Sequence, residues 1–361
     1  MFEKFSNIFR FGPKEFLGID IGSSFIRMVE LGKKGKNLNL NNYGEIGLVS
    51  VDKPFRVVKD DSISFSNKEI AKGIKSVMKE AEMTAKHVGF SIPDFGSFFT
   101  RIELPAMDKD EIPEAVKYQV RPYVPLPLED VTLDWFIVQG AVGETVLKIL
   151  VVAIPNEIVA QYEEIAQLID LKLKFLEPEV FALSRSSAQR LKDKEVIGVV
   201  DIGARSTTCS VLDKGTLKVS HSFNMAGDEL TRLIAGSLNI DYGKAEAIKR
   251  QYGLLPDEKQ QGSKNIRKLL MPLAGSILDE IKKAFRNYYL QEGKEVEKIV
   301  LSGGVSLMPG LKEFFSVEIK KPVVLADPFL GIASPPILKD TLKQLSPYYG
   351  VSVGLALKGL E

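Results

Sequence analysis

The order of apolar and polar residues predicts a chain in which β-strands alternate with amphipathic helices. Apolar runs of strand length, bounded by glycine or polar residues, occur at 17–31 and 37–48. Apolar residues three and four positions apart predict helices at 67–82 and 266–291, the second preceded by a polar surface loop at 256–265. This mixture predicts an α/β protein, and a length of 361 residues favours two or three domains.

Two segments repeat the pattern of a strand, an Asp-Ile-Gly turn and a second strand. They are GIDIGSSFIRMVEL at Gly18–Leu31 and VVDIGARSTTCSVL at Val199–Leu212. Because glycine lacks a Cβ, backbone N–H groups at such a turn can come close to a phosphate oxygen. Either copy alone is more often a plain tight hairpin.

A third glycine-rich segment is IVLSGGVSLMPGLKEFF at Ile299–Phe315, which is expected to follow a strand and to open a helix. Gly303 and Gly304 could then approach a base or a ribose. The three segments together predict a nucleotide held in a cleft between two domains, and their shared order argues against a coincidence of hairpins.

Composition narrows the classes of partner and chemistry. The chain has 48 basic and 47 acidic residues, which argues against DNA or an anionic membrane sheet as a broad electrostatic partner. The single cysteine, Cys209, lies in an apolar strand, so we expect a buried thiol, no internal disulfide and a reducing compartment. His87 and His221 have no His or Cys neighbour at metal-binding spacing, which argues against a zinc site or a Ser-His-Asp triad.

No segment has the length and hydrophobicity of a membrane span. The longest apolar run is ILVVAI at 149–154, far short of the roughly 20 residues required. The N-terminal MFEKFSNIFRFG lacks the apolar core of a signal peptide, so we expect a soluble cytosolic protein. Its apolar residues at helical spacing are expected to pack on their own domain more often than on lipid. They are Phe2, Phe5, Ile8 and Phe9.

Three further stretches resemble the PilM family of type IV pilus assembly proteins, which are relatives of the cell-division protein FtsA in the actin-like superfamily. They are the Leu-Pro and Glu-rich helix at Leu104–Val124, LEDVTLDW at Leu128–Trp135 and EPEVFALSRS at Glu177–Ser186. The order of the two Asp-x-Gly turns and the Ser-Gly-Gly loop is that of the superfamily. The resemblance covers almost the whole chain. It implies an α/β, two-lobed actin-like fold, a duplicated ribonuclease H-like fold, with an FtsA-type 1C α+β insert (SHS2 domain) in lobe I.

The resemblance also implies domain bounds. Lobe I would comprise subdomain 1A at 1–94 and 171–194, the latter with the interlobe helix, and the 1C insert at 95–170. Lobe II would comprise subdomain 2A at 195–225 and 296–345 and subdomain 2B at 226–295, and 346–361 would be a C-terminal helix returning to lobe I.

For the site, the resemblance implies ATP and Mg²⁺. Asp20 and Asp201 would face each other and hold Mg²⁺, mostly through water. Backbone N–H groups of both turns would cradle the β- and γ-phosphates, at Gly22, Ser23, Ser24, Gly203, Ala204 and Arg205. Arg27 would reach the phosphates, and the other expected nucleotide contacts are Gly227, Lys244, Glu246, Lys249, Gly303, Gly304 and Ser306. The alternatives are a solvent-facing strand residue for Arg27 and a solvated charged helix face for the residues at 244–249.

Hydrolysis requires an oriented water as well as clamped phosphates. Glu177 is the candidate for that role, since it precedes Pro178 at the start of the helix that links the lobes. The alternative is a carboxylate that complements the helix dipole. The sequence therefore predicts ATP binding and leaves open whether the protein is an enzyme.

The implied function is a cytoplasmic ATP-binding component of the inner-membrane platform that assembles the pilus. It would bind the N-terminal cytoplasmic tail of the membrane protein PilN, contact other inner-membrane components, possess a capacity for self-association, and reach the membrane only through PilN. Phe98, Phe99 and Tyr118 could line the groove for the tail, with core packing as the alternative. Two other functions stay open: an FtsA-like filament-forming ATPase at the membrane, and a small-molecule kinase, which needs a catalytic Asp.

Overall fold

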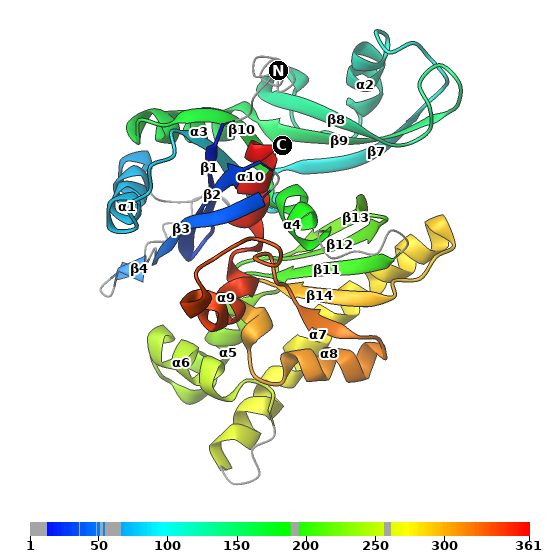
Figure 1. Cartoon of the computed structure of the whole chain (residues 1–361). Coiled ribbons are helices and arrows are strands. Elements are labelled where there is room, and N and C mark those ends of the chain that lie inside the picture. Colours follow the sequence, from blue (N-terminus) through cyan, green and yellow to red (C-terminus); the bar gives the residue numbers. More distant parts are fainter. Residues whose placement is uncertain are drawn as a thin grey trace. The chain divides into compact units, whose positions relative to one another are not determined.

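The computed structural model describes residues 13–35, 37–47, 49–50, 53–54, 66–188, 195–255 and 261–361. The chain divides into two compact units (Figure 1). Unit 1 comprises Met1–Ala182 and Leu355–Glu361, and unit 2 comprises Leu183–Gly354. The chain passes from one unit to the other within helices α4 (Glu179–Ala188) and α10 (Gly350–Leu360). The predicted apolar stripe at Phe2–Phe9 lies outside the described residues.

Unit 1 is built on a five-stranded sheet in the order β10-β6-β1-β2-β3. Strands β1, β2 and β3 form an antiparallel meander, and β6 and β10 continue the sheet in parallel to β1. The strands are β1 (Glu15–Ile21), β2 (Phe25–Lys34), β3 (Asn37–Gly47), β6 (His87–Ile92) and β10 (Lys172–Pro178). The short strands β4 (Val49–Ser50) and β5 (Lys53–Pro54) follow β3 in the sequence and pair with each other. Helices α1 (Asn67–Glu80) and α3 (Asn156–Leu168) pack on each other.

Helix α1 shows why the sequence folds as predicted here. Ser66 and Glu69 form a reciprocal capping box that satisfies the first N–H groups of the helix. Ile70, Ile74 and Val77, spaced four and three residues apart, are buried in the core of unit 1. The helix predicted at 67–82 is thereby confirmed.

The segment between β6 and α3 forms a small α+β layer with a core of its own. Strands β7 (Phe98–Leu104), β9 (Leu147–Pro155) and β8 (Val131–Gln139) pair antiparallel in the order β7-β9-β8, and α2 (Ile112–Val120) supplies buried apolar residues to that core. Single 3₁₀ turns occur at η2 (Asp94–Gly96) and η3 (Leu128–Asp130).

The orientation of Tyr118 differs from the sequence interpretation. Helix α2 buries Ile112, Val116 and Val120, which lie on one stripe. Tyr118 falls between them on the opposite face and is 80% exposed, so neither core packing nor an inward orientation applies to it.

Unit 2 repeats the sheet topology of unit 1. Its order is β13-β12-β11-β14-β15, with an antiparallel meander β11-β12-β13 and parallel strands β14 and β15 next to β11. The strands are β11 (Val196–Ile202), β12 (Thr207–Asp213), β13 (Thr216–Phe223), β14 (Lys298–Ser302) and β15 (Val323–Leu325). The helices are α5 (Gly227–Leu238), α6 (Tyr242–Tyr252), α7 (Gln261–Glu292), α8 (Leu311–Ile319) and α9 (Lys339–Leu345), with 3₁₀ turns η4 (Gly304–Leu307), η5 (Pro336–Leu338) and η6 (Ser346–Tyr348).

Two helices of unit 2 begin at other residues than the sequence predicts. Helix α7 begins at Gln261, so the last part of the loop expected at 256–265 is helical, and the part at 256–260 lies outside the described residues. Polarity alone suggested a loop, but a polar first turn can extend a helix that its later apolar residues anchor. After β14, helix α8 begins only at Leu311, because Pro309 disfavours helix before it and Gly310 adopts φ +80°.

One expectation about the core is confirmed. The Cys209 thiol is fully buried in unit 2, and burial raises its pKa far above the ordinary value, so it is an unreactive apolar residue. Within the part of the chain that the structure describes, no helix combines the length and hydrophobicity of a membrane span.

Candidate functional site

The first Asp-x-Gly turn joins β1 to β2. Asp20 pairs across the hairpin with Arg27, and the Gly22 N–H donates to the Phe25 carbonyl oxygen at 3.0 Å, which closes the turn. The Asp20 side chain is buried, and its Oδ1 accepts a hydrogen bond from Ser91 Oγ at 2.7 Å. Burial raises the pKa of Asp20, against the opposing effects of the Ser91 hydrogen bond and the Arg27 charge.

The second turn joins β11 to β12 and has the same geometry. Asp201 pairs with Thr208, and the Gly203 N–H donates to the Ser206 carbonyl oxygen, also at 3.0 Å. In both turns the glycine N–H, which was expected to contact phosphate, is engaged in closing the turn. Phosphate contact by the other residues of the turns, Ser23, Ser24, Ala204 and Arg205, stays a prediction.

Helix α5 begins directly behind the second turn. The Gly227 N–H donates to the Gly203 carbonyl oxygen at 3.0 Å, and the Asp228 N–H donates to that of Ala204 at 2.7 Å. A Cβ at position 227 would lie 2.8 Å from Val305 Cγ2 and 3.1 Å from the Gly203 oxygen, so only glycine fits. The expected site residues Gly203, Ala204 and Gly227 are thus brought together.

Lys249 of α6 supports this arrangement from the interior. Its side chain is buried, and Nζ donates to the Gly227 carbonyl oxygen at 3.1 Å and to Thr231 Oγ1 at 2.9 Å. The ammonium group also pairs with Glu246 Oε2 at 2.6 Å. Burial lowers the pKa of Lys249, and the neighbouring Glu246 carboxylate partly opposes that effect. Lys249 is therefore not part of a solvated charged face.

Glu246 and Lys244 differ in their surroundings. Burial alone raises the pKa of Glu246, but the Lys249 charge and hydrogen bonds from Lys249, Thr231 and Arg250 hold it below its ordinary value. Lys244 is exposed at the start of α6, where its N–H donates to Asp241 Oδ1 at 2.9 Å and its ammonium lies 3.2 Å from the same carboxylate. Lys244 therefore fits the solvated face, whereas Glu246 belongs to the Lys249 cluster.

The Gly-Gly loop after β14 lies against β11. Gly303 adopts φ +81°, and a Cβ there would lie 2.4 Å from the Ile202 carbonyl oxygen. The Gly303 N–H donates to the Pro347 carbonyl oxygen at 2.9 Å, and Ser306 Oγ donates to the Gly303 carbonyl oxygen at 2.6 Å. Gly304 begins the 3₁₀ turn, in which Val305 contacts the position of Gly227. Unit 2 thus gathers most of its expected site residues.

Arg27 is held by a residue that sequence reasoning missed. Its Nε lies 3.0 Å from Glu45 Oε2, and its guanidinium lies over the Phe25 ring at 4.9 Å from the ring centre. The Arg27 side chain is 14% exposed, so it is not a plain solvent-facing residue. The β2–β3 register places Arg27 opposite Glu45, and the charge complementarity of two adjacent strands was the available signal.

Glu177 lies at the end of strand β10, just before α4. Its side chain is buried, and its Oε1 accepts a hydrogen bond from Lys358 Nζ of α10 at 2.9 Å. Glu177 is paired in register with Ser91 of β6, the serine that donates to Asp20. Glu177 and Asp20 therefore flank Ser91 on adjacent strands. The sequence analysis did not identify Lys358 or Ser91, although Ser91 is a polar residue between the apolar residues Phe90 and Ile92 of β6.

The donor set fits a nucleotide with Mg²⁺. Among the described residues, no three or more His, Cys, Asp and Glu side chains gather where they could hold a metal ion. Each turn instead offers a single carboxylate, which suits an ion that keeps water and takes phosphate oxygens as further ligands.

The chain is similar to known proteins in sequence and in fold. A family model described as type IV pilus assembly protein PilM matches residues 18–360. The cell division proteins FtsA of Enterococcus faecalis and Pseudomonas aeruginosa are 28% and 27% identical over 142 and 189 residues, which are 34% and 47% of this chain. The chain spans 32% and 44% of the lengths of these curated relatives.

Solved structures extend the similarity to the fold. A chain of the PilM-PilN type IV pilus biogenesis complex superposes with a TM-score of 0.85 at 25% identity, over 97% of this chain and 100% of that one. MreB 5 of Spiroplasma citri bound to AMPPNP superposes with a TM-score of 0.51 at 13% identity, over 92% of this chain and 97% of that one. The expected actin-like fold class is therefore confirmed. Because the family model matches nearly the whole chain, the protein belongs to the PilM family of type IV pilus assembly proteins.

Proposed function

We propose that this protein is an ATP-binding component of type IV pilus assembly that works at the inner face of the cytoplasmic membrane. The observation that carries the proposal is the duplicated turn, in which a glycine N–H donates to a carbonyl oxygen at 3.0 Å in both units, two residues after an aspartate. A plain hairpin does not explain why two sheets of equal topology end in the same turn. The neighbour MreB 5 was solved with AMPPNP, an ATP analogue.

In this proposal the residues have distinct tasks. Asp20 and Asp201 hold Mg²⁺, which neutralises phosphate charge when bound. The tips of both turns donate N–H groups to phosphate oxygens. Gly227 allows α5 to begin against the second turn, and Lys249 fixes the Gly227 carbonyl and the first turn of α5. Lys249 therefore acts through the backbone of the site as a positioning residue.

Nucleotide binding is tested by Asp201→Ala. We expect the variant to lose Mg²⁺-dependent binding of a fluorescent ATP analogue, measured by anisotropy. Asp340→Ala, which removes an exposed carboxylate from the first turn of α9, is the matched control and should bind as the wild type does. Equal affinities of the Asp201 variant and the wild type would remove the carboxylate clamp from the proposal.

Hydrolysis is tested at Glu177, which we propose as the residue that orients the attacking water. Glu177→Gln should retain ATP and lose phosphate release, because an amide cannot take up a proton from water. Lys358→Met removes the partner of Glu177 without changing the carboxylate, and it separates a catalytic role from an ion pair that only stabilises unit 1. If the two variants lose activity in proportion to their stability, Glu177 is structural. Bound ATP without turnover in the wild type would make ATP a conformational ligand.

We further propose that the partner is the cytoplasmic N-terminal tail of PilN, and that nucleotide state is coupled to this contact. The neighbour with a TM-score of 0.85 is the PilM-PilN complex. Phe98 and Phe99 are half-buried against separate cores of unit 1, whereas Tyr118 is exposed and available. Tyr118→Ala should weaken binding of a synthetic tail peptide. Tyr289→Ala removes a half-exposed tyrosine of unit 2 and should leave peptide binding unchanged.

The FtsA similarity favours one alternative, a filament-forming ATPase. ATP-dependent sedimentation of the purified protein separates the two functions. A pellet that forms with ATP and is absent with ADP supports the filament, and a protein that stays in the supernatant with both nucleotides supports the assembly component.

A further inference from the structure

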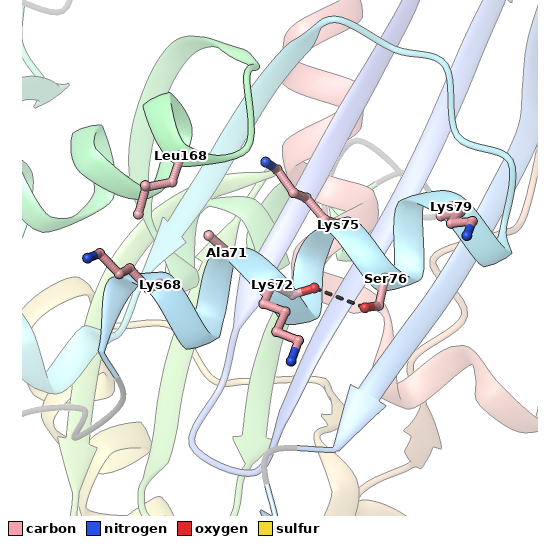
Figure 2. A pocket seen from close by; sticks show the side chains of 7 residues that line it. All are labelled: Lys68, Ala71, Lys72, Lys75, Ser76, Lys79 and Leu168. Carbon is pink, nitrogen blue, oxygen red and sulfur yellow. Dashed lines mark hydrogen bonds between the residues drawn. The ribbon is translucent and has the colours of Figure 1, made fainter.

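Helix α1 carries a stripe of four lysines outside the proposed nucleotide site. Lys68, Lys72, Lys75 and Lys79 are spaced four, three and four residues apart, so they lie along one face. All four are exposed, and they line a hollow of about 360 Å³ with Ala71, Ser76 and Leu168 of α3 (Figure 2). Figure 2 shows their side chains fanning out from the helix. We call these four residues the α1 lysine stripe.

Among the residues that the structure describes, no carboxylate neutralises the stripe. None of its ammonium groups forms an ion pair with a residue that the structure describes. Two acidic residues of these helices are engaged elsewhere: Glu69 accepts hydrogen bonds from Ser66, and Glu164 of α3 accepts one from Asn67 Nδ2 at 2.6 Å. The positive charge therefore faces solvent.

This arrangement is unfavourable for the isolated helix. Like charges four residues apart destabilise a helix, and Lys68 lies in the first turn, where the helix dipole favours negative charge. The helix does not need the lysines to fold, since its capping box and buried apolar face provide for that. An external anionic surface would relieve the repulsion along the whole stripe.

We infer that the α1 lysine stripe binds the anionic headgroups of a phospholipid membrane. The four lysines extend over about 16 Å of helix, so they present a line of charge and not a single anion site. Clusters of four or more lysines on an amphipathic helix are typical of proteins that bind anionic lipid. The apolar face of α1 is buried in the core, so the contact is electrostatic and peripheral, without insertion into the lipid. The net charge of +1 does not show this local patch, because it sums over the whole chain.

The experiment uses the full chain, without any partner protein, and vesicles of phosphatidylcholine with or without one quarter phosphatidylglycerol. We expect co-sedimentation with the anionic vesicles only, and a decline as NaCl rises from about 50 to 500 mM. A lysine near an anionic surface contributes about a fivefold gain in partitioning, so Lys72→Glu/Lys75→Glu should reduce it at least about 25-fold. Lys72→Gln/Lys75→Gln should reduce it less.

The matched control is Lys339→Glu/Lys343→Glu, which makes the same change of charge on the exposed face of α9 in unit 2. It should partition as the wild type does. Three outcomes would overturn the inference: no binding of the wild type to anionic vesicles, equal losses in both reversal variants, or unchanged binding of the α1 variant. If the wild-type protein binds duplex DNA and does not bind the vesicles, the ligand of the stripe is nucleic acid instead. Nucleotide-binding measurements on the same variants keep this test separate from that of the proposed function.

Discussion

The two units have sheets of the same topology and the same Asp-x-Gly turn, but they support that turn in different ways. In unit 2 the backbone does so, because the first N–H groups of α5 donate to the Gly203 and Ala204 carbonyl oxygens. In unit 1 side chains do so, because Ser91 donates to Asp20 and Glu45 holds Arg27. A backbone scaffold fixes the turn itself, whereas a side-chain scaffold fixes the carboxylate and the cation beside it.

The two units differ in which substitutions they tolerate. Unit 2 buries a charged residue, Lys249, to hold the start of α5, and a buried charge is costly once its partner is lost. Unit 1 places its corresponding ion pair, Arg27 with Glu45, nearer to solvent, where the Glu45 side chain is 37% exposed. Equal turns can therefore depend on interactions of very different strength.

The largest expected effect is at Lys249. Lys249→Met leaves the Gly227 carbonyl oxygen and Glu246 without their buried cation, and we expect a loss of about 2 to 3 kcal/mol in the stability of unit 2. Arg27→Met, the counterpart in unit 1, should cost less than about 1 kcal/mol. Hydrogen exchange of peptides from α5–α6 and from β1–β2 measures the two units separately. Equal losses at both positions would contradict the difference between the scaffolds.

The second test concerns a feature that the units share. Gly89 of β6 makes room for the Phe175 ring and Gly198 of β11 for the Phe285 ring, since a Cβ at either glycine would lie 2.4 Å from the ring. Gly89→Ala and Gly198→Ala should each destabilise by about 1 to 3 kcal/mol, through overpacking. Thermal unfolding measures the loss.

Combination with Phe175→Leu or Phe285→Leu should recover part of the loss, because the smaller side chain leaves space for the new methyl group. An Ala variant that is as stable as the wild type would show that the sheet can shift, and the close packing would then not constrain the position of the turn.

The third test is the pH dependence of stability, for which the units have opposite signs. Burial raises the pKa of Asp20, so the folded state binds the proton more tightly than the unfolded state does, and stability falls as pH rises through that window. Asp20→Asn should therefore increase stability at neutral pH, because it removes the cost of burying the carboxylate. Burial alone raises the pKa of Asp213 in unit 2, but the hydrogen bond and charge of Lys294 and the hydrogen bond from Tyr288 bring it below the ordinary value.

The Asp213 contribution is thus present above the unfolded pKa and is lost as pH falls through the folded one. Asp213→Asn should lower stability at neutral pH and flatten the acid limb of the stability curve. Urea titrations at pH 3 to 8 measure both variants. The same sign of change in both would contradict the assignment, and a stabilised Asp20→Asn that no longer binds Mg-ATP would show that the site retains its carboxylate for function.

The sequence predicts much of this fold because local signals and tertiary structure agree. Three local patterns are preserved in the folded structure: the capping box at Ser66, the period-2 strands of both hairpins, and the duplicated turns. The supports of the turns were not predictable in the same way. Lys358 and Glu177 are separated by 181 residues, and Ser91 and Asp20 by 71, so only the tertiary fold brings each pair together. Tyr118 was misplaced because apolar character alone does not show which face of a helix a residue occupies.

The smallest expected effect distinguishes two buried tyrosines. Tyr288 of unit 2 is fully buried and donates to Asp213 Oδ2 at 3.3 Å, whereas the hydroxyl of Tyr162 in unit 1, also fully buried, has no hydrogen-bond partner among the described residues. Removing a satisfied hydroxyl costs about 1 kcal/mol, whereas removing an unsatisfied one costs little or stabilises by a few tenths of a kcal/mol.

Tyr288→Phe should therefore lower the urea midpoint and Tyr162→Phe should leave it unchanged or raise it. The two substitutions remove the same atom from equally buried rings, so each is the control for the other. A loss of about 1 kcal/mol at Tyr162 would mean that a water molecule satisfies the hydroxyl, because an unpaired group cannot contribute that much by its presence. Burial first, and then the charges of Glu179 and Asp20, raise the pKa of Tyr162, so the hydroxyl keeps its proton and can donate it to such a water.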